Sequence, residues 1–419
     1  MKYHFLDDYP QLRPLLLAVF TDVLGMCIII PFLPIFTIQY GIDAFLLGFI
    51  ISSNAIFGFI FSPILGKLSD RYGRKPCMLF AQSGTLMGFL VFTLSNSIYL
   101  LLLARIIDGI FSGQLAISNA VICDVVPPQN RGKQMTTMGG AATFAFIFGP
   151  SISGFFYQMY GIFAVGILAM IIASFNILLT AVWLPESHPR RIERKPEVIA
   201  QNNQALQANL ANNSTAGSPP TQKVERVSSI LKNSKTLYIL TLFCIVDLAE
   251  FIFETTLSLF VFQYHGLSIT QIGLVYTSMA IFQVSFRVFL FSPLHKKLGD
   301  IKTLIMGGVV YISDFLLMSM NFGFWYVLVL MLYITLGVVF TRGILIGFVS
   351  RTVDANSQGK MMGITSSLDS FTQIVGPFIG TFLLMNQTGV FFLLSLVGLS
   401  GIAFVMSFRL FRFGFDAKS

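Results

Sequence analysis

The chain has 419 residues, of which 55% are hydrophobic and 11% are charged. Soluble domains usually carry about 25% charged residues, so this composition excludes an ordinary soluble domain and predicts a membrane protein. The formal net charge of +8 comes from 27 Lys and Arg against 19 Asp and Glu, and its meaning depends on where these residues fall.

Twelve apolar runs of about 20 residues follow one another, and each is long enough to cross a hydrocarbon core about 30 Å thick as a helix. The first run contains Asp22 and lacks a small-residue cleavage site, so we expect a retained span rather than a signal peptide. Because the runs are continuous rather than alternating, a membrane β-barrel is excluded. Numbered as spans 1 to 12, they are 13–37, 44–66, 77–95, 98–122, 135–157, 161–184, 237–262, 270–293, 303–320, 325–349, 361–384 and 388–408.

The basic residues lie almost entirely on one side of the predicted membrane. Of the 27 Lys and Arg, 24 fall in the termini and the even-numbered connections, and three lie within spans, namely Arg105, Arg287 and Arg342. By the positive-inside rule, both termini are predicted to be cytoplasmic. This distribution accounts for the positive charge, so no nucleic-acid partner is expected.

One long polar stretch, residues 185–236, is rich in Asn, Gln, Ser and Pro and separates the first six spans from the last six. Such a composition is typical of a flexible linker. We therefore predict an all-α membrane protein with twelve transmembrane helices. It consists of a six-helix bundle at 1–184, a cytoplasmic linker at 185–236, and a second six-helix bundle with a short cytoplasmic tail at 237–419.

The two halves match each other at nearly constant offsets. "FSPILGKLSD" at 61–70 matches "FSPLHKKLGD" at 291–300, and "RGKQM" at 131–135 matches "QGKMM" at 358–362. Asp22 falls opposite Asp247. Parallel repeats of six spans enclose a binding site near the midplane in many transporters. The alternative is that similar turn residues recur at helix ends by composition alone.

The predicted spans contain ten ionisable side chains, and each is a functional candidate because a charge in the bilayer centre is costly. Asp247, Glu250 and Glu254 are spaced i, i+3, i+7, so they project from one face of span 7. Three carboxylates in one low-dielectric cavity cannot all ionise at low cost, so at least one is expected to exchange protons near neutral pH. The alternative is that they only neutralise arginines. The proton-coupling candidates are Asp22, Asp247, Glu250 and Glu254.

The depth of these groups predicts two charge layers. Counting 1.5 Å per residue, Asp22, Asp247 and Arg342 lie about 10 to 15 Å from the cytoplasmic ends, where Arg342 can pair with either aspartate. Arg105 and Glu254 lie at a similar depth from the other face, with Asp108 and Glu250 between the layers. Arg287 can snorkel toward the cytoplasmic surface, and Asp314 and Asp369 can be interhelical contacts.

Cysteine and histidine give no metal or catalytic site. The four cysteines, Cys27, Cys77, Cys123 and Cys244, are widely spaced, so neither a disulfide framework nor a zinc site is predicted. All four histidines fall outside the spans, so a membrane-embedded metal hydrolase lacks its ligands.

Several motifs carry a resemblance to a known family. "GKLSDRYGRKP" at 66–76 resembles the loop motif between spans 2 and 3 of the major facilitator superfamily, and "LLLARIIDG" resembles its fourth-span motif. "GGAATFAFIFGPSISG" is similar to the fifth-span motif of its drug/proton antiporters, and "TDVLGMCIIIPFLP" resembles the tetracycline-efflux branch. In that fold spans 1, 4, 7 and 10 line the central cavity. The resemblance thus implies substrate contacts from Asp22, Arg105, Asp108, Glu250 and Arg342.

The loop motif is expected to act as a cytoplasmic gate. By resemblance, Asp70 takes a hydrogen bond from a nearby arginine or caps the start of span 11 when the cytoplasmic side is closed. The second copy, "FSPLHKKLGDIK", keeps Asp300 but lacks the second glycine and the basic pair, so any latch is expected to be asymmetric. The alternative is a topology anchor only. The motif residues are Gly66 and Gly73, expected to permit a tight turn, with Asp70, Arg71, Arg74 and Lys75.

Two sets of small residues are expected to let spans 5 and 11 bend and approach their neighbours closely. They are Gly149, Pro150 and Gly154 on span 5, and Gly376, Pro377 and Gly380 on span 11.

We predict a secondary transporter that exports a small amphipathic or cationic compound by alternating access in exchange for protons. No GxxxxGK[ST] motif is present, so a proton gradient rather than a nucleotide cofactor is expected to supply the energy. The expected partners are the substrate, protons and the bilayer of a cell inner (plasma) membrane, with a monomer as the working unit. An importer of a metabolite is one alternative, a non-transporting receptor or scaffold a second, and an enzyme a remote third.

Overall fold

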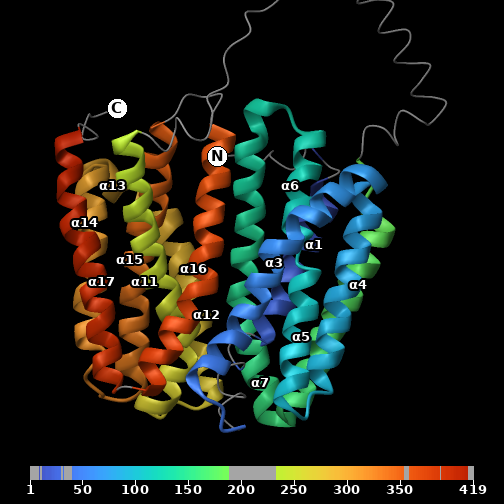
Figure 1. Ribbon diagram of the computed structural model, residues 1–419, viewed down its shortest axis with the longest axis horizontal. Coiled ribbons are helices and arrows are strands. Elements are labelled where there is room, and N and C mark those ends of the chain that lie inside the picture. The colour runs from blue at the N-terminus through green and yellow to red at the C-terminus, as the bar shows by residue number, and fades with distance from the viewer. Residues whose placement is uncertain are drawn as a thin grey trace, which may run out of the picture.

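The computed structural model describes residues 9, 12–29, 32, 40–187, 233–352, 358–386 and 388–413, and in these ranges it contains helices and no strand. The helices form two groups that stand side by side (Figure 1), with α1 to α7 in one and α11 to α17 in the other. Most of the predicted linker at 185–236 lies outside the described residues. The two groups are called the N half and the C half below.

The N half contains one broken helix and one bent helix. Residues 111–113 separate α5 from α6, which together cover the predicted fourth span. The 56-residue α7 covers the fifth and sixth spans and bends at Gly161, where φ is 77° and glycine carries no Cβ to oppose that conformation. The helices are α1 (Arg13–Ile29), α3 (Ala44–Tyr72), α4 (Arg74–Thr93), α5 (Ile98–Ile110), α6 (Gln114–Val125) and α7 (Pro128–Trp183).

The C half has a π-helical turn inside its second span. This turn, η4 (Arg287–Phe291), joins α12 (Ile269–Phe286) to α13 (Ser292–Leu298). The remaining elements are α11 (Ser234–His265), α14 (Asp300–Leu317), α15 (Phe324–Arg351), α16 (Gln358–Asn386), α17 (Gly389–Arg409) and the short turn η6 (Leu410–Phe413).

Nine helices in the described part of the chain are long and apolar enough to cross a membrane. Their outer faces carry large apolar side chains, such as Phe45, Phe289 and Trp325, whose exposed fractions are 70%, 74% and 74%. Side chains of this kind are stable on a surface that contacts lipid, so the structure is that of a multi-pass membrane protein.

The turn between α3 and α4 consists of one residue, Gly73, with φ 103° and ψ 155°. Gly66 lies inside α3, six residues before that helix ends, so the prediction that it permits the turn is wrong: the helix continues past it to Tyr72. In the C half, Gly299 with φ 78° separates α13 from α14 in the same way. The second copy lacks a glycine at the position that aligns with Gly73, but Gly299 makes the turn in its place.

The hydrogen bonds described between the two halves all lie at the end of the bundles opposite Gly73. On one side, Ser52 of α3 donates to the carbonyl of Ile374 at 2.7 Å, and Thr381 of α16 donates to the carbonyl of Ala44 at 2.9 Å. Gly48 permits this approach, because a Cβ there would lie 2.9 Å from the Cα of Phe378.

A second seam joins α7 to α12 at the same end. Ser151 bonds to Thr277 at 2.6 Å, and Thr277 donates to the carbonyl of Ile147 at 2.8 Å. A Cβ on Gly273 would lie 2.5 Å from the carbonyl oxygen of Pro150. Closer to the Gly73 end of α7, Gly139 and Gly140 face open space. Among the described residues, the hydrogen bonds that join the halves are therefore confined to one end of the bundles.

The glycines of the two predicted bending motifs lie at close helix contacts. A Cβ on Gly149 would lie 2.5 Å from Cys27 of α1, and one on Gly380 would lie 2.7 Å from Thr256 of α11. Gly376 also packs against α11, and Gly154 packs against α12. Pro150 and Pro377 lie inside α7 and α16. The close contact between spans 5 and 1 in the N half is therefore repeated by the close contact between spans 11 and 7 in the C half.

Candidate functional site

A cavity of about 260 Å³ lies in the C half and is closed on one side by α7 of the N half. Its wall contains two acids, Glu250 and Glu254, which both come from α11. Five aromatic rings surround them, and Thr143, Gln283 and Thr335 add neutral polar groups. The rings are those of Phe146, Phe253, Tyr276, Tyr311 and Phe315. An apolar wall with a few convergent polar groups is typical of a small-molecule site.

One arginine holds three carboxylates beside this cavity. Arg342 of α15 lies 3.5 Å from Asp247 and 3.6 Å from Glu250 of α11, and 3.3 Å from Asp369 of α16. Thr372 also donates to Asp247. Asp247 Oδ1 and Glu250 Oε2 are buried and have no hydrogen-bond donor among the described residues. One guanidinium cannot balance three ionised carboxylates, so the cluster can take up protons or a cation.

The three carboxylates of α11 share a face, as the sequence predicts, but they do not share a role. Asp247 is 2% exposed and held by Arg342 and Thr372, whereas Glu250 touches both Arg342 and the cavity. Glu254 lines the cavity one turn further along, where Tyr276 donates to its backbone carbonyl at 3.4 Å. Along this face of α11, Asp247 belongs to the ion pair, Glu254 belongs to the cavity wall, and Glu250 belongs to both.

Arg105 and Asp108 form a separate ion pair inside the N half. Their closest atoms are 3.3 Å apart, and Asn54 of α3 donates to the same Asp108 oxygen at 2.7 Å. Both charged side chains are buried. The sequence placed Arg105 in a layer with Glu254, but its described ion-pair partner is Asp108, three residues along its own helix.

Asp22 lies apart from the main cavity. It lines a small polar pocket in the N half together with Gln82, Thr85, Gln114 and Asn176. Gln82 donates to Asn176 at 3.2 Å and Gln114 donates to Thr85 at 3.2 Å, which leaves Asp22 among amide and hydroxyl groups. Of the two aspartates that the sequence offered to Arg342, the structure brings it Asp247.

The substrate contacts expected from the sequence are thus only partly brought together. Glu250 lines the cavity, and Arg342 lies next to it through the ion pair with Glu250. Asp22, Arg105 and Asp108 lie in the N half and are not among the residues that line it. Sequence reasoning assigned no role to Tyr276 and Tyr311, because an aromatic residue in an apolar run carries no signal of which way it points.

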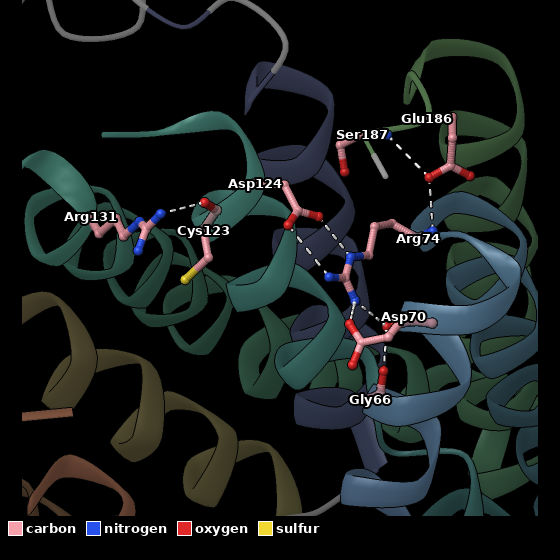
Figure 2. Close-up of polar contacts among 9 residues, drawn as sticks. Gly66, Asp70, Arg74, Cys123, Asp124, Arg131, Glu186 and Ser187 are labelled. Atoms are coloured by element: carbon pink, nitrogen blue, oxygen red, sulfur yellow. Dashed lines mark hydrogen bonds and ion pairs between the residues drawn. The ribbon is translucent and has the colours of Figure 1, made fainter. Parts of the chain in front are cut away.

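The loop motif forms an ion cluster around Arg74 (Figure 2). The Arg74 guanidinium is buried and lies 2.6 Å from Asp70 and 2.8 Å from Asp124 at the end of α6. Its backbone N–H donates to Glu186 at 2.8 Å, just after α7 ends. The cluster thereby ties the start of α4 to the ends of α3, α6 and α7. Arg71 and Lys75 flank it, with Arg71 exposed and Lys75 half-buried.

Sequence reasoning missed Asp124 and Glu186 in this cluster. Asp124 stands in "VICDVVPP" and Glu186 in "WLPESH", each just outside an apolar run, where an acid is ordinary. Only the turn at Gly73, which places Arg74 between α3 and α6, gives these acids a common partner.

A family model described as Major Facilitator Superfamily matches residues 15–368 and 239–413. The chain belongs to this superfamily. Superfamily proteins are membrane transporters rather than enzymes, and a small-molecule substrate moved by an ion gradient without a bound cofactor is their general mode.

Relatives within the superfamily include several efflux proteins. The chain is 28% identical over 372 residues to the class H tetracycline resistance protein of Pasteurella multocida, with 88% of each chain covered. It is 26% identical to the class G protein of Vibrio anguillarum, covering 86% of this chain and 87% of that one. It is 34% identical over 168 residues to the multi-drug resistance efflux pump PmrA of Streptococcus pneumoniae, covering 39% and 42%.

Solved structures of superfamily members share the fold at low identity. The human organic anion transporter MFSD10 matches with a TM-score of 0.63 and 20% identity, covering 94% of this chain and 98% of that one. A D-xylose-proton symporter matches with a TM-score of 0.70 and 15% identity, covering 94% and 96%. At these identities the likeness shows the fold and does not identify a substrate.

Proposed function

We propose that the chain is a proton-coupled exporter of a small amphipathic or cationic compound. The observation that carries this proposal is the cavity, in which aromatic rings surround Glu250 and Glu254 and an arginine outnumbered by acids lies beside them. The relatives named for tetracycline resistance and multidrug efflux support the export direction.

The proposal includes twelve spans with both termini in the cytoplasm. To the nine long apolar helices we add α1 and α14, and we count the 54 residues of Asn130–Trp183 as two spans because they bend at Gly161. The division into bundles at 1–184 and 237–419, joined by a linker at 185–236, follows. Because the Arg74 end carries the Lys and Arg of the connections, we assign it to the cytoplasm of a cell whose inner (plasma) membrane holds the monomer.

In this orientation the two seams close the outer side, and we take the cytoplasmic side to be open because no described hydrogen bond joins the halves there. Ser52, Thr277 and Thr381 hold the outer ends of the halves together. An exporter in this state accepts substrate from the cytoplasm or from the inner leaflet. Export then requires the seams to separate and the Asp70 side to close, with Asp70 as the proposed gate.

Protons act in this scheme by changing the charge of the carboxylates in one state more than in the other. The candidates are Glu250 and Glu254 at the cavity, Asp247 beside Arg342, and Asp22 in its own pocket. A cationic substrate and a proton both reduce the negative charge of the cavity, so binding of one disfavours binding of the other. Such competition is what exchange requires.

The test uses purified protein in liposomes with an imposed pH gradient. Tetracycline or a lipophilic cation should accumulate in vesicles whose cytoplasmic face points outward and whose interior is acidic, and the accumulation should collapse when the gradient is removed. Flux in the opposite direction would support an importer, and absence of any gradient-dependent flux would contradict the proposal.

At the residue level, Glu250→Gln should reduce gradient-driven accumulation at least tenfold, while exchange without a gradient is retained better. Asp22→Asn, Asp247→Asn and Glu254→Gln are tested singly in the same assay. Asp43→Asn is the matched control, because Asp43 caps α3 outside the cavity and asparagine caps a helix equally well. Unchanged coupling in all four variants would remove the proton sites proposed here.

A further inference from the structure

Arg287 is a charged residue that the proposed mechanism has not used. It begins the π-helical turn η4 directly after α12, and its side chain is exposed. No ion pair links it to another described residue, in contrast to Arg74, Arg105, Arg342 and Arg351. An unpaired arginine within a predicted span requires a solvent, a lipid phosphate or a ligand as its partner.

Its place on the helix decides among these partners. Tyr276, Met279, Ala280 and Gln283 of α12 line the cavity. An α-helix turns by about 100° per residue, so positions can be given as angles around the axis of α12, measured from Tyr276. On this scale the four lining residues lie between about −60° and +40°, and Arg287 lies at about +20°. Arg287 therefore continues the cavity-lining stripe.

Arg287 lies beyond the cavity lining of α12, on the side away from the seam between the halves. It follows Gln283 by four residues, or about 6 Å, in the direction away from the seam at Thr277. The opposite side of the same turn is marked by Phe289, which is two residues further along and 74% exposed. Arg287 is not itself among the lining residues, but its position on the helix places it on the cavity side of α12, next to the lining, and not on the side of Phe289.

The wall that α7 contributes to the cavity carries no acid. α7 contains no Asp or Glu along its whole length, and its Gly139 and Gly140 face open space. The acids of the cavity lie deeper, on α11, where Glu250 is held by Arg342. The π-helical turn is a second mark of this place, because such turns occur often at functional sites.

We propose that Arg287 binds an anionic group of the transported compound and so selects substrates that carry both charges. The cationic group of such a compound lies toward Glu250 and Glu254, and its anionic group lies at Arg287. This inference rests on the proposed function and adds the charge pattern of the substrate to it.

The experiment compares two probes in inverted vesicles that contain the full-length protein. Tetracycline at neutral pH carries a protonated dimethylamino group and an ionised enol, whereas tetraphenylphosphonium carries a positive charge only. For Arg287→Gln we expect the apparent KM for tetracycline to rise about tenfold, with the tetraphenylphosphonium KM unchanged or lower, since one charge-assisted hydrogen bond is lost only by tetracycline. Arg287→Lys should restore much of the tetracycline affinity.

Lys296→Gln is the matched control, because it removes a positive charge from the exposed surface of α13 near the same end of the molecule. Its two KM values should equal those of the wild type. Equal changes for both probes in Arg287→Gln, or no change for either, would overturn the inference and leave Arg287 as a lipid-contacting residue. If the wild type transports tetraphenylphosphonium but not tetracycline, the inference about Arg287 is wrong and the proposed function stands. If the wild type transports neither probe under a pH gradient, the proposed function is wrong as well.

Discussion

The turn between α3 and α4 and the turn between α13 and α14 have the same shape and opposite charges. Gly73 and Gly299 both adopt positive φ with extended ψ, and the next residue begins a helix. That residue is Arg74 in the N half and Asp300 in the C half. Arg74 pairs with Asp124 at the end of α6, and Asp300 pairs with Arg351 at the end of α15, at 2.8 and 2.6 Å.

This comparison shows that the repeat retains an ion pair between equivalent places and not the residues that make it. The alignment of "FSPILGKLSD" with "FSPLHKKLGD" places Asp70 opposite Asp300. The structure places Arg74 opposite Asp300, because the connection after span 8 is shorter and its glycine stands four positions earlier in the motif. An ion pair joins the same two spans whichever of them carries the positive charge, because the attraction requires only that the two charges have opposite signs.

The largest expected effect on the free energy of unfolding comes from exchanging the charges of the Arg74–Asp124 pair, one residue at a time, so that they match the charges of Asp300 and Arg351. Arg74→Asp places a carboxylate among Asp70, Asp124 and Glu186 and should lower the free energy of unfolding by about 3 kcal/mol or more, because buried ion pairs are costly to break. Adding Asp124→Arg should recover at least half of this loss. Thermal unfolding in detergent measures both.

Arg71→Asp is the control for this pair of variants, because it makes the same change of charge at an exposed neighbour. It should cost less than about 1 kcal/mol. If the double variant is no more stable than Arg74→Asp, the two ion pairs are not equivalent and the comparison fails.

A smaller and equal effect is expected from the two turn glycines. Gly73→Ala and Gly299→Ala each place a Cβ on a backbone with φ of 103° and 78°, in a region that costs other residues about 1 to 3 kcal/mol. Both variants should lower the unfolding free energy by similar amounts in the same detergent assay. Gly66→Ala is the control: Gly66 lies inside α3 with no atom near its Cβ position, so alanine should be neutral or stabilising. A loss confined to Gly73→Ala would show that the C-half turn tolerates other conformations.

Much of the architecture follows from the sequence because hydrophobic length and charge placement act locally. The apolar runs predicted the helices, and the spacing of Asp247, Glu250 and Glu254 predicted their common face. Partners could not be predicted in this way. Whether Arg342 pairs with Asp22 or Asp247 depends on how helices that are distant in the sequence pack together. A count of residues from the membrane surface gives the depth of a side chain but not the helix that it faces.

The turns show the same limit on a smaller scale. A glycine-rich motif indicates that a turn is near, but helix propagation decides where it falls, and α3 continues through Gly66 because nothing in the following residues stops it before Gly73. The shift of the C-half glycine by four positions could not be recognised, since a gap of four residues cannot be told from substitution in a match of ten.

The next prediction compares the stability effects of substituting Asp70 and Asp300, which the sequence alignment places opposite each other. Asp300 is 17% exposed and bonds to Arg351 at 2.6 Å and His295 at 3.0 Å, whereas Asp70 is 63% exposed. Asp300→Asn should therefore lower the unfolding free energy by about 1.5 kcal/mol, and Asp70→Asn by about 0.5 kcal/mol or less. The transport rate should change in the opposite order, because an exposed Asp70 can take a new partner if its end of the bundles closes as proposed. Equal rates for the two variants would leave Asp70 as a topology anchor.

The smallest effect concerns the start of α4, where the two halves differ in the source of the negative charge. Glu186 Oε1 accepts from the N–H of Arg74 at 2.8 Å and of Ser187 at 3.1 Å, so a residue after span 6 supplies the charge that Asp300 supplies within α14 itself. Glu186→Gln keeps an acceptor oxygen and removes the charge beside the helix N-terminus. Its unfolding free energy should fall by about 0.5 kcal/mol, and the difference should shrink in high salt. Glu186→Ala, which also removes the acceptor, should cost about twice as much in the same detergent titration. Equal losses for the two variants would show that the hydrogen bond contributes nothing beyond the charge of Glu186, which would then act on Arg74 only as a third negative charge beside Asp70 and Asp124.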